Sequence, residues 1–347
     1  MSTIEKGSGE GAGEDGEKFP QAFSLEENQR VVLEFEKLLG ERGLAIPTNS
    51  PLEEASLGIL EMMELRKNKA IHNLQIDCRE RWRQALSLAD IARKALRAQH
   101  HAGFDNLLPH LRLLLEPSNF SQFSGSQDSA SPKEKETNNK VFELFVAVIL
   151  FQICSNLRFD DPYKSSGDNP DVIGEFNRKI WAFACKVSHS ENPKTFLERV
   201  RDGVAQIRKT KDADHGIVIV NLKNLVPHDE IWPAILNKSS GAWSYGACTN
   251  RDAPVNRIRH LFRQFEGKVY ALVGSRQAFV DEFMGEKAVP MVLMFWCAVG
   301  SYCPRIGVVQ PLVVKQMTSI GVTNEQLDSE AGKLIALFND YLHDCTE

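Results

Sequence analysis

The sequence has no surplus of positive charge, since its 347 residues include 41 Lys and Arg against 46 Asp and Glu. A nucleic-acid-binding protein with this balance needs a local basic patch. The longest apolar run, residues 288–300, is too short to cross a bilayer, which takes about 20 residues. The seven cysteines are an odd number without closely paired spacing, which argues against a disulfide framework. We therefore expect a cytoplasmic protein without a membrane-spanning segment.

Composition divides the chain into four parts. Residues 1–20 are rich in Gly and Glu and cannot bury a core, so we expect a disordered tail. Residues 21–116 have helical periodicity and predict an α-helical domain. Residues 117–137 are rich in Ser and poor in aliphatic side chains, which indicates a linker or mobile loop. Residues 138–347 contain both helical and strand patterns and predict an α/β domain.

Four helices are expected in the helical domain. Ser24 is a predicted N-cap followed by acids, and Pro51 begins a second helix. A third helix, about residues 74–99, is rich in Arg, with Asp and Glu interleaved. Such a mixture is typical of a solvated helix face, although the Arg side chains could instead contact phosphates. A shorter helix at about residues 104–115 completes the domain.

The α/β domain begins with a helix whose apolar residues repeat at intervals of three and four from Val141 to Ile153. A short strand at 157–159 follows, and the β-branched run 216–222 predicts a central strand covered on both faces. The apolar positions of residues 193–208 predict a crossover helix between strands. The remaining elements expected are helices at 231–236, 254–265 and 324–343, and strands at 269–273 and 292–299.

Residues 169–187 form the most informative stretch. Two β-branched and aromatic runs meet at Asn177-Arg178, which is the pattern of a β-hairpin with a two-residue turn. In that register the numbers of opposed residues add to 355, so Asp171 faces Ala184. Because side chains alternate along a strand, Asp171, Ala184 and Lys186 are expected on one face. Glu175 points to the same side, but it lies roughly 13 Å along the strand from Asp171.

These residues resemble the PD-(D/E)XK, or restriction-endonuclease-like, nuclease superfamily. Pro170-Asp171 matches the PD, and Ala184-Cys185-Lys186 stands at the place of the (D/E)-x-K, with Ala184 where the second acid is expected. The resemblance implies an α/β fold with a core ordered α-β-β-β-α-β around a mixed central sheet. It covers about residues 138–222.

The resemblance also implies roles for individual residues. Asp171 would bind Mg²⁺ or Mn²⁺ together with Glu143 and the backbone carbonyl of Cys185, and Lys186 would hold the attacking water. Hard cations of this kind prefer carboxylates and waters, and they lower the pKa of a bound water. Gln206 matches a residue of the crossover helix that reaches the site in many relatives. Glu143 could equally be a surface residue near a helix start.

A basic cluster follows the motif along the crossover helix, and its members are Arg199, Arg208, Lys209 and Lys211. Clustered cations of this kind can bind a phosphate backbone, although the same cluster also suits an exposed helix face. Arg257, Arg259 and Arg263 form a second group of basic residues.

Three explanations fit the Ala at position 184. Another acid, such as Glu143, completes an active site; the residue was changed to inactivate an enzyme; or the fold has lost catalysis. We expect a metal-dependent nuclease acting on DNA, in bacterial antiviral defence or DNA processing. The alternative is a catalytically degenerate module that binds nucleic acid or a protein. In the nuclease, the helical domain would recognise a protein partner, a second copy of the chain, a signal or the nucleic acid.

Overall fold

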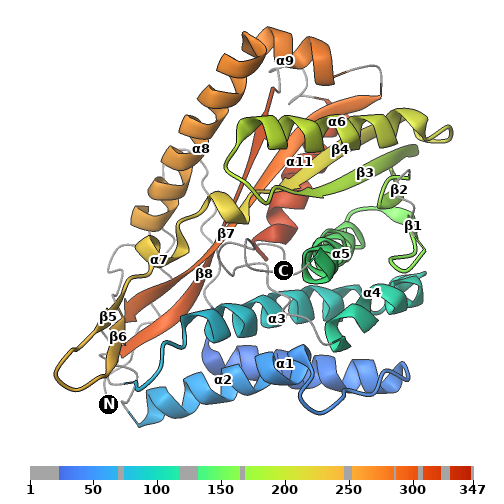
Figure 1. The fold of residues 1–347 in the computed structure, drawn as a ribbon. Coiled ribbons are helices and arrows are strands. Elements are labelled where there is room, and N and C mark those ends of the chain that lie inside the picture. The colour runs from blue at the N-terminus through green and yellow to red at the C-terminus, as the bar shows by residue number, and fades with distance from the viewer. Residues whose placement is uncertain are drawn as a thin grey trace, which may run out of the picture.

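The computed structural model describes residues 23–68, 74–116, 132–164, 169–245, 252–284, 287–303, 308–321 and 329–344. Its centre is a six-stranded mixed sheet with helices on both faces, so the protein has a mixed α/β fold (Figure 1). The expected tail, residues 1–20, lies outside the described residues. So does most of the expected linker.

The sheet has the order β1-β2-β3-β4-β7-β8. Its strands are β1 (Ser155–Phe159), β2 (Val172–Phe176), β3 (Lys179–Val187), β4 (His215–Asn221), β7 (Ala288–Cys303) and β8 (Val308–Ile320). β1, β2 and β3 are antiparallel neighbours, β3, β4 and β7 run parallel, and β8 returns antiparallel to β7. The strand expected at 216–222 is confirmed as β4, which is buried on both faces.

The hairpin register expected from the sequence is confirmed. Val172 lies opposite Phe183 and Phe176 lies opposite Lys179, so opposed residue numbers add to 355. Asn177 and Arg178 have φ angles of 51° and 63°. Two consecutive residues with positive φ make a type I′ turn, whose twist matches that of the strands. This turn fixes which side chains of β2 and β3 share a face.

Two hydrophobic cores lie on the two faces of the sheet. Phe183 and Cys185 of β3 belong to the core under α5 (Pro132–Leu150), whereas Ala182 and Ala184 belong to the core under α6 (Pro193–Lys209). α8 (Asp252–Val273) and α9 (Arg276–Phe283) extend the α6 side, and α11 (Glu330–Leu342) lies on the α5 side. Figure 1 shows α5 and α6 on opposite sides of β3. The alternation along β3 thus separates the two cores.

The N-terminal helices are α1 (Leu25–Glu41), α2 (Pro51–Lys67), α3 (Arg79–Ala98), η2 (Phe104–Leu107), α4 (Leu108–Arg112) and η3 (Leu113–Leu115). Of these, α3, α4 and η3 pack against α5, and α1 and α2 pack against α3. Ser24 caps α1 in a capping box with Glu27, as its sequence predicts. Apolar side chains of α1, α3, α5 and α11 form one continuous core with the sheet. The helical region therefore shares its core with the α/β region.

Three expected elements differ in the structure. Residues 269–273 continue helix α8, because Val269 extends the apolar spacing of Phe262 and Phe265. The helix expected at 231–236 is instead α7 (His228–Ile231) followed by β5 (Ala234–Leu236). Pro233 disfavours helical geometry at the residue before it, so α7 ends there. α5 begins at Pro132, so the end of the expected linker is helical.

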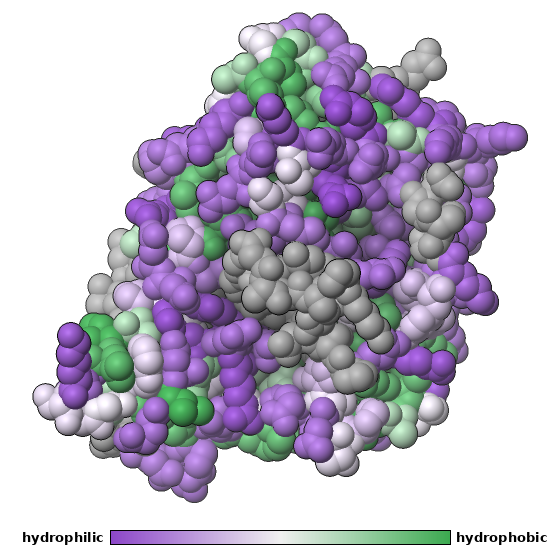
Figure 2. All heavy atoms as spheres, viewed as in Figure 1, coloured by the Kyte–Doolittle hydropathy of each residue, from purple (hydrophilic) through white to green (hydrophobic). Residues whose placement is uncertain are grey.

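The remaining elements are short. η4 (Lys223–Leu225) follows β4, and β5 pairs with β6 (Trp243–Tyr245) in a small separate sheet. Hydrophilic side chains cover most of the face seen in Figure 2, where apolar ones form small groups. Among the helices that the structure describes, none has both the length and the apolar character needed to cross a bilayer.

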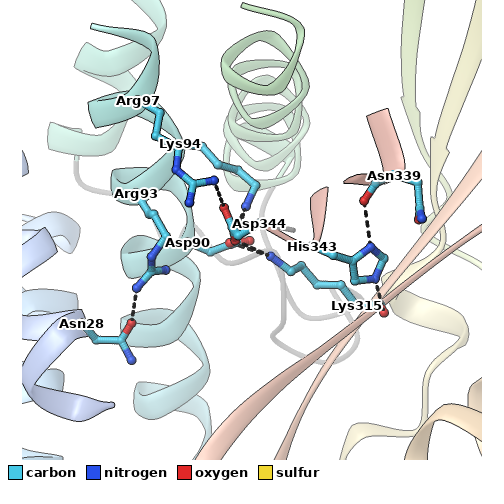
Figure 3. Close-up of polar contacts among 9 residues, drawn as sticks. All are labelled: Asn28, Asp90, Arg93, Lys94, Arg97, Lys315, Asn339, His343 and Asp344. Atoms are coloured by element: carbon cyan, nitrogen blue, oxygen red, sulfur yellow. Dashed lines mark hydrogen bonds and ion pairs between the residues drawn. The ribbon is translucent and has the colours of Figure 1, made fainter. Parts of the chain in front are cut away.

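Four charged residues of α3, namely Arg83, Asp90, Arg93 and Lys94, are buried, which corrects the expectation of a solvated helix face. Lys94 Nζ donates to Asp90 at 2.8 Å and to Asp344 at 3.0 Å, and Lys315 Nζ of β8 donates to Asp90 at 2.8 Å. Arg97 adds a bond to Asp344, as Figure 3 shows. Asp90, Lys94, Lys315 and Asp344 are each at most 6 % exposed. These ion pairs join α3, β8 and the residues that directly follow α11.

We predict that Lys315→Met lowers the free energy of unfolding by about 3 kcal/mol, because it removes one partner from a buried ion-pair network. Met retains most of the side-chain volume, so the loss reports the charge. Chemical denaturation monitored by circular dichroism measures it. Lys333→Met, at an exposed position of α11, is the matched control and should be close to neutral. A similar loss in both variants would contradict the prediction.

Candidate functional site

The candidate site forms where β3 extends beyond the start of β2. The backbone N–H of Asp171 donates to the carbonyl of Phe183 at 3.0 Å, and β2 pairing begins at the next residue. Cys185 lies two residues further along β3, and its N–H donates to Asp171 Oδ2 at 2.6 Å. The carboxylate thus accepts the hydrogen bond that a carbonyl of a neighbouring strand would otherwise accept from this N–H. This bond holds Asp171 at the open edge of β3.

A pocket of about 170 Å³ lies at this edge, between α5 and α6. Six of the residues expected at the site line it: Glu143, Asp171, Cys185, Lys186, Arg199 and Gln206. Its remaining lining residues are Glu136, Asn139, Lys140 and Val187. Side chains from α5, β3 and α6 and from the start of β2 therefore converge on one small cavity.

A larger pocket, of about 710 Å³, lies at the edge of β1 and β2. Glu175 lines it and accepts a hydrogen bond from Asn156 Nδ2 at 2.8 Å. Glu175 does not line the smaller pocket, in agreement with the separation from Asp171 expected along β2. We take the smaller pocket as the candidate site, because two carboxylates, Glu143 and Asp171, and two lysines, Lys140 and Lys186, line it.

Glu143 and Asp171 are two buried carboxyl groups beside each other, each 5 % exposed. Burial and the nearby charge of Glu143 raise the pKa of Asp171 to about 7. Burial likewise raises the pKa of Glu143, against the opposing effect of Lys140. Two adjacent acids in a poorly solvated site cannot easily both be ionised. The two carboxyl groups therefore tend to keep one proton between them, and a cation that binds both would displace it.

Two lysines partly balance these acids. Lys186 Nζ lies 3.9 Å from Asp171 Oδ2, and Lys140 Nζ lies 2.9 Å from Glu143 Oε1. Burial by itself would lower the pKa of Lys140, but the carboxylate of Glu143 raises it above its ordinary value. Lys140 was not among the site residues predicted from the sequence. Its position three residues before Glu143, on the same helix face, is the signal that could have found it.

His110 of α4 is a further neighbour of Glu143 that was not predicted from the sequence. Its Nε2 lies 3.9 Å from Glu143 Oε2, and its ring packs edge-on to Phe159 with centroids 6.2 Å apart. Burial lowers the pKa of His110 to about 4, so the ring is neutral at neutral pH. The motif contains no signal for this contact, because α4 precedes it in the chain and reaches the site through tertiary packing.

Ala184 is buried against α6 and does not line the pocket. A Cβ at Gly203 of α6 would lie 3.3 Å from the Cβ of Ala184 and 2.8 Å from Val218. The helix therefore approaches β3 closely at this point, where Gly leaves room for it. The side of β3 on which the second motif acid was expected is covered by α6, so an acid at position 184 would enter a packed apolar region.

The basic cluster of the crossover helix is divided by the structure. Arg199 lines the pocket and lies 3.8 Å from Asp202, with an exposed side chain. Arg208, Lys209 and Lys211 are exposed at and beyond the C-terminal end of α6 and do not line the pocket. Gln206 is buried and lines the pocket.

The oxygen atoms at the pocket could hold a hard cation that needs only a few protein ligands. Asp171 and Glu143 supply carboxylate oxygens. The N–H of Cys185 points to Asp171, and since the N–H and C=O of one strand residue point to the same side, the Cys185 carbonyl faces the same edge. Mg²⁺ is commonly held by one or two carboxylates with waters and phosphates. Within the described ranges, no group of three or more His, Cys, Asp or Glu side chains is arranged as a metal site.

Comparison with known proteins gives no relative for this chain. No protein-family model, no curated protein and no solved structure matches it. Any function assigned to the pocket must therefore follow from the positions and the chemistry of its residues.

We predict that Asp171→Asn stabilises the folded protein at pH 8 by about 2 kcal/mol. An acid whose folded pKa is raised, here to about 7 from about 3.9, stabilises the fold below pH about 4 and loses that contribution as pH rises to about 7. Asn can still accept from Cys185 but has no charge to bury. Denaturation at pH 5 and pH 8 measures the difference. Asp281→Asn, at an exposed position of α9, is the control. A destabilised Asp171→Asn at pH 8 would refute this.

We predict that Ala184→Glu destabilises the protein by about 3 kcal/mol or more, because it overpacks the contact with α6 and buries a charge. Ala205→Glu, on the exposed face of α6, should have little effect. Thermal unfolding of both variants provides the measurement. If Ala184→Glu folds with unchanged stability, position 184 has more space than the structure indicates.

Proposed function

We propose that this protein is a metal-dependent nuclease that hydrolyses DNA phosphodiester bonds, built on a restriction-endonuclease-like core. The order α5-β1-β2-β3-α6-β4 supports the proposal, because it matches the α-β-β-β-α-β order of that core. The hairpin register also supports it, since it brings Asp171 next to the strand that carries Lys186.

The observation that carries the proposal is the convergence of Glu143, Asp171, Lys186 and Gln206 on one pocket. These residues come from α5, the start of β2, β3 and α6, and they are the four catalytic residues expected from the motif. Buried acids with raised pKa values beside lysines are costly to the fold. Such arrangements are concentrated at functional sites.

The residues of the pocket suit phosphodiester hydrolysis. A bound Mg²⁺ or Mn²⁺ would supply charge neutralisation and a more acidic water. Asp171, Glu143 and the Cys185 carbonyl would hold the cation. Lys186 would orient the attacking water or stabilise charge on the phosphate, and Gln206 would position the same groups by hydrogen bonding.

Basic residues at and beyond the rim of the pocket would position the nucleic acid. Arg199 is exposed there and would contact the phosphate backbone. Arg208, Lys209 and Lys211 lie further along α6, so they would contact the nucleic acid only if it extends along that helix. The net charge of −5 makes such local contacts necessary.

A second candidate function is a non-catalytic module that binds nucleic acid or a protein partner. It is favoured by the Ala at position 184, which faces α6, and by the engagement of Glu143 with Lys140. In this case the acids and lysines would be a buried ion-pair cluster, and cations would not be required for binding.

The two candidates are separated by a cleavage assay. The full chain is incubated with Mg²⁺ or Mn²⁺ and with plasmid and linear DNA, beside Asp171→Ala and Lys186→Ala. We expect metal-dependent cleavage by the natural sequence and a loss of at least about 100-fold in either variant, because each removes a group that acts in the transition state. Chelation of the metal should abolish cleavage.

Control variants test whether a loss of cleavage is specific to the pocket residues. Asp281→Ala and Lys194→Ala change exposed residues outside the pocket and should retain activity. Circular dichroism confirms that each variant is folded. Absence of cleavage together with DNA binding that neither Asp171→Ala nor Lys186→Ala alters would reject the nuclease and favour the binding module.

A further inference from the structure

Lys140 contacts both carboxylate oxygens of Glu143. Its Nζ lies 2.9 Å from Oε1 and 3.0 Å from Oε2, so a single ammonium group engages both carboxylate oxygens. The Glu143 side chain is 6 % exposed and that of Lys140 is 13 % exposed. The ammonium therefore occupies the position between the two oxygens, where a cation bound to both of them would lie.

Each buried acid of the pocket has a lysine beside it. Glu143 faces Lys140, and Asp171 lies 3.9 Å from Lys186. A divalent cation that replaces the proton shared by the two acids leaves an excess of positive charge on these four groups, which a phosphate group would compensate. Cation and phosphate are thus expected to favour each other's binding, as two ligands coupled through the same charges.

We propose that Lys140 is a built-in counter-ion that occupies Glu143 until a divalent cation displaces it, and that the released ammonium then binds a phosphate oxygen of the nucleic acid. This inference rests on the proposed function, because it takes Glu143 as a metal ligand. It adds Lys140 as a phosphate-binding residue of that site.

The geometry of Lys140 suits both positions. Lys140 and Glu143 are three residues apart on α5 and share one helix face. Lysine carries a compact charge on a flexible stem with rotatable donors, so it can exchange partners without backbone movement. Lys140 also lines the pocket, so a released ammonium remains within reach of a bound phosphate.

Mn²⁺ binding to the full chain tests the first part. Lys140→Met removes the competing charge and keeps an unbranched side chain, so Mn²⁺ should bind about tenfold more tightly than to the natural sequence, as measured by calorimetry. Lys194→Met, an exposed lysine at the start of α6, should leave the affinity unchanged. If Lys140→Met does not fold, Lys140→Gln keeps a donor for Glu143 and should also bind Mn²⁺ more tightly.

Each outcome has a distinct meaning. Equal or weaker Mn²⁺ binding by the folded variant overturns the counter-ion proposal and leaves the nuclease proposal in place. Binding by the variant but not by the natural sequence supports the counter-ion and contradicts a cation-dependent enzyme. Absence of binding by both proteins overturns both proposals.

DNA binding tests the second part. With saturating Ca²⁺ in place of Mn²⁺, Lys140→Met should bind a short duplex about tenfold more weakly than the natural sequence, while Lys140→Arg should retain most of the affinity. Unchanged DNA affinity in Lys140→Met would overturn the phosphate role.

Discussion

The site depends on one hydrogen bond, from the N–H of Cys185 to the carboxylate of Asp171. β3 continues past the point where pairing with β2 begins, so this amide has no strand carbonyl opposite it. A buried N–H without an acceptor is costly, and Asp171 supplies the acceptor. The same bond fixes a carboxylate at the edge of the sheet, where α5 adds a second acid and the lysines offset their charge.

Local pattern was sufficient to predict the hairpin and the crossover helix. The turn at Asn177-Arg178, the β-branched runs and the spacing of apolar residues in α6 are local properties, and the structure confirms them. The strand expected at 269–273 was wrong, because a short apolar run fits a helix or a strand equally well. Longer periodic segments were therefore predicted better than short ones.

The residues that pack around the candidate site were harder to predict from the sequence. Asp171, Lys186, Glu143 and Gln206 were predicted from the order of the motif and its flanking elements, and they line one pocket. The packing of Gly203 against Ala184 depends on how closely α6 approaches the sheet, and the contact of His110 depends on how the helical layer docks. Such distances between elements are not encoded in any single stretch of sequence.

The charges of α3 illustrate the same limit. Acidic and basic residues are interleaved there as on a solvated helix, yet Asp90 and Lys94 are buried and have partners far along the chain. Lys315 is 225 positions from Asp90, and Asp344 is 250 positions from Lys94. A charge pattern becomes a buried network only when distant segments supply partners of opposite sign.

The continuous core that joins the N-terminal helices to α5 and the sheet has a thermodynamic consequence. A separate domain needs an apolar core of its own, and here the residues of α3 and α5 complete each other's packing. Residues 23–116 expressed alone would expose the apolar surface that α5 covers, and the remainder would expose the matching surface. The two regions should therefore unfold together in a single cooperative transition, with neither half able to persist as an independent folding unit.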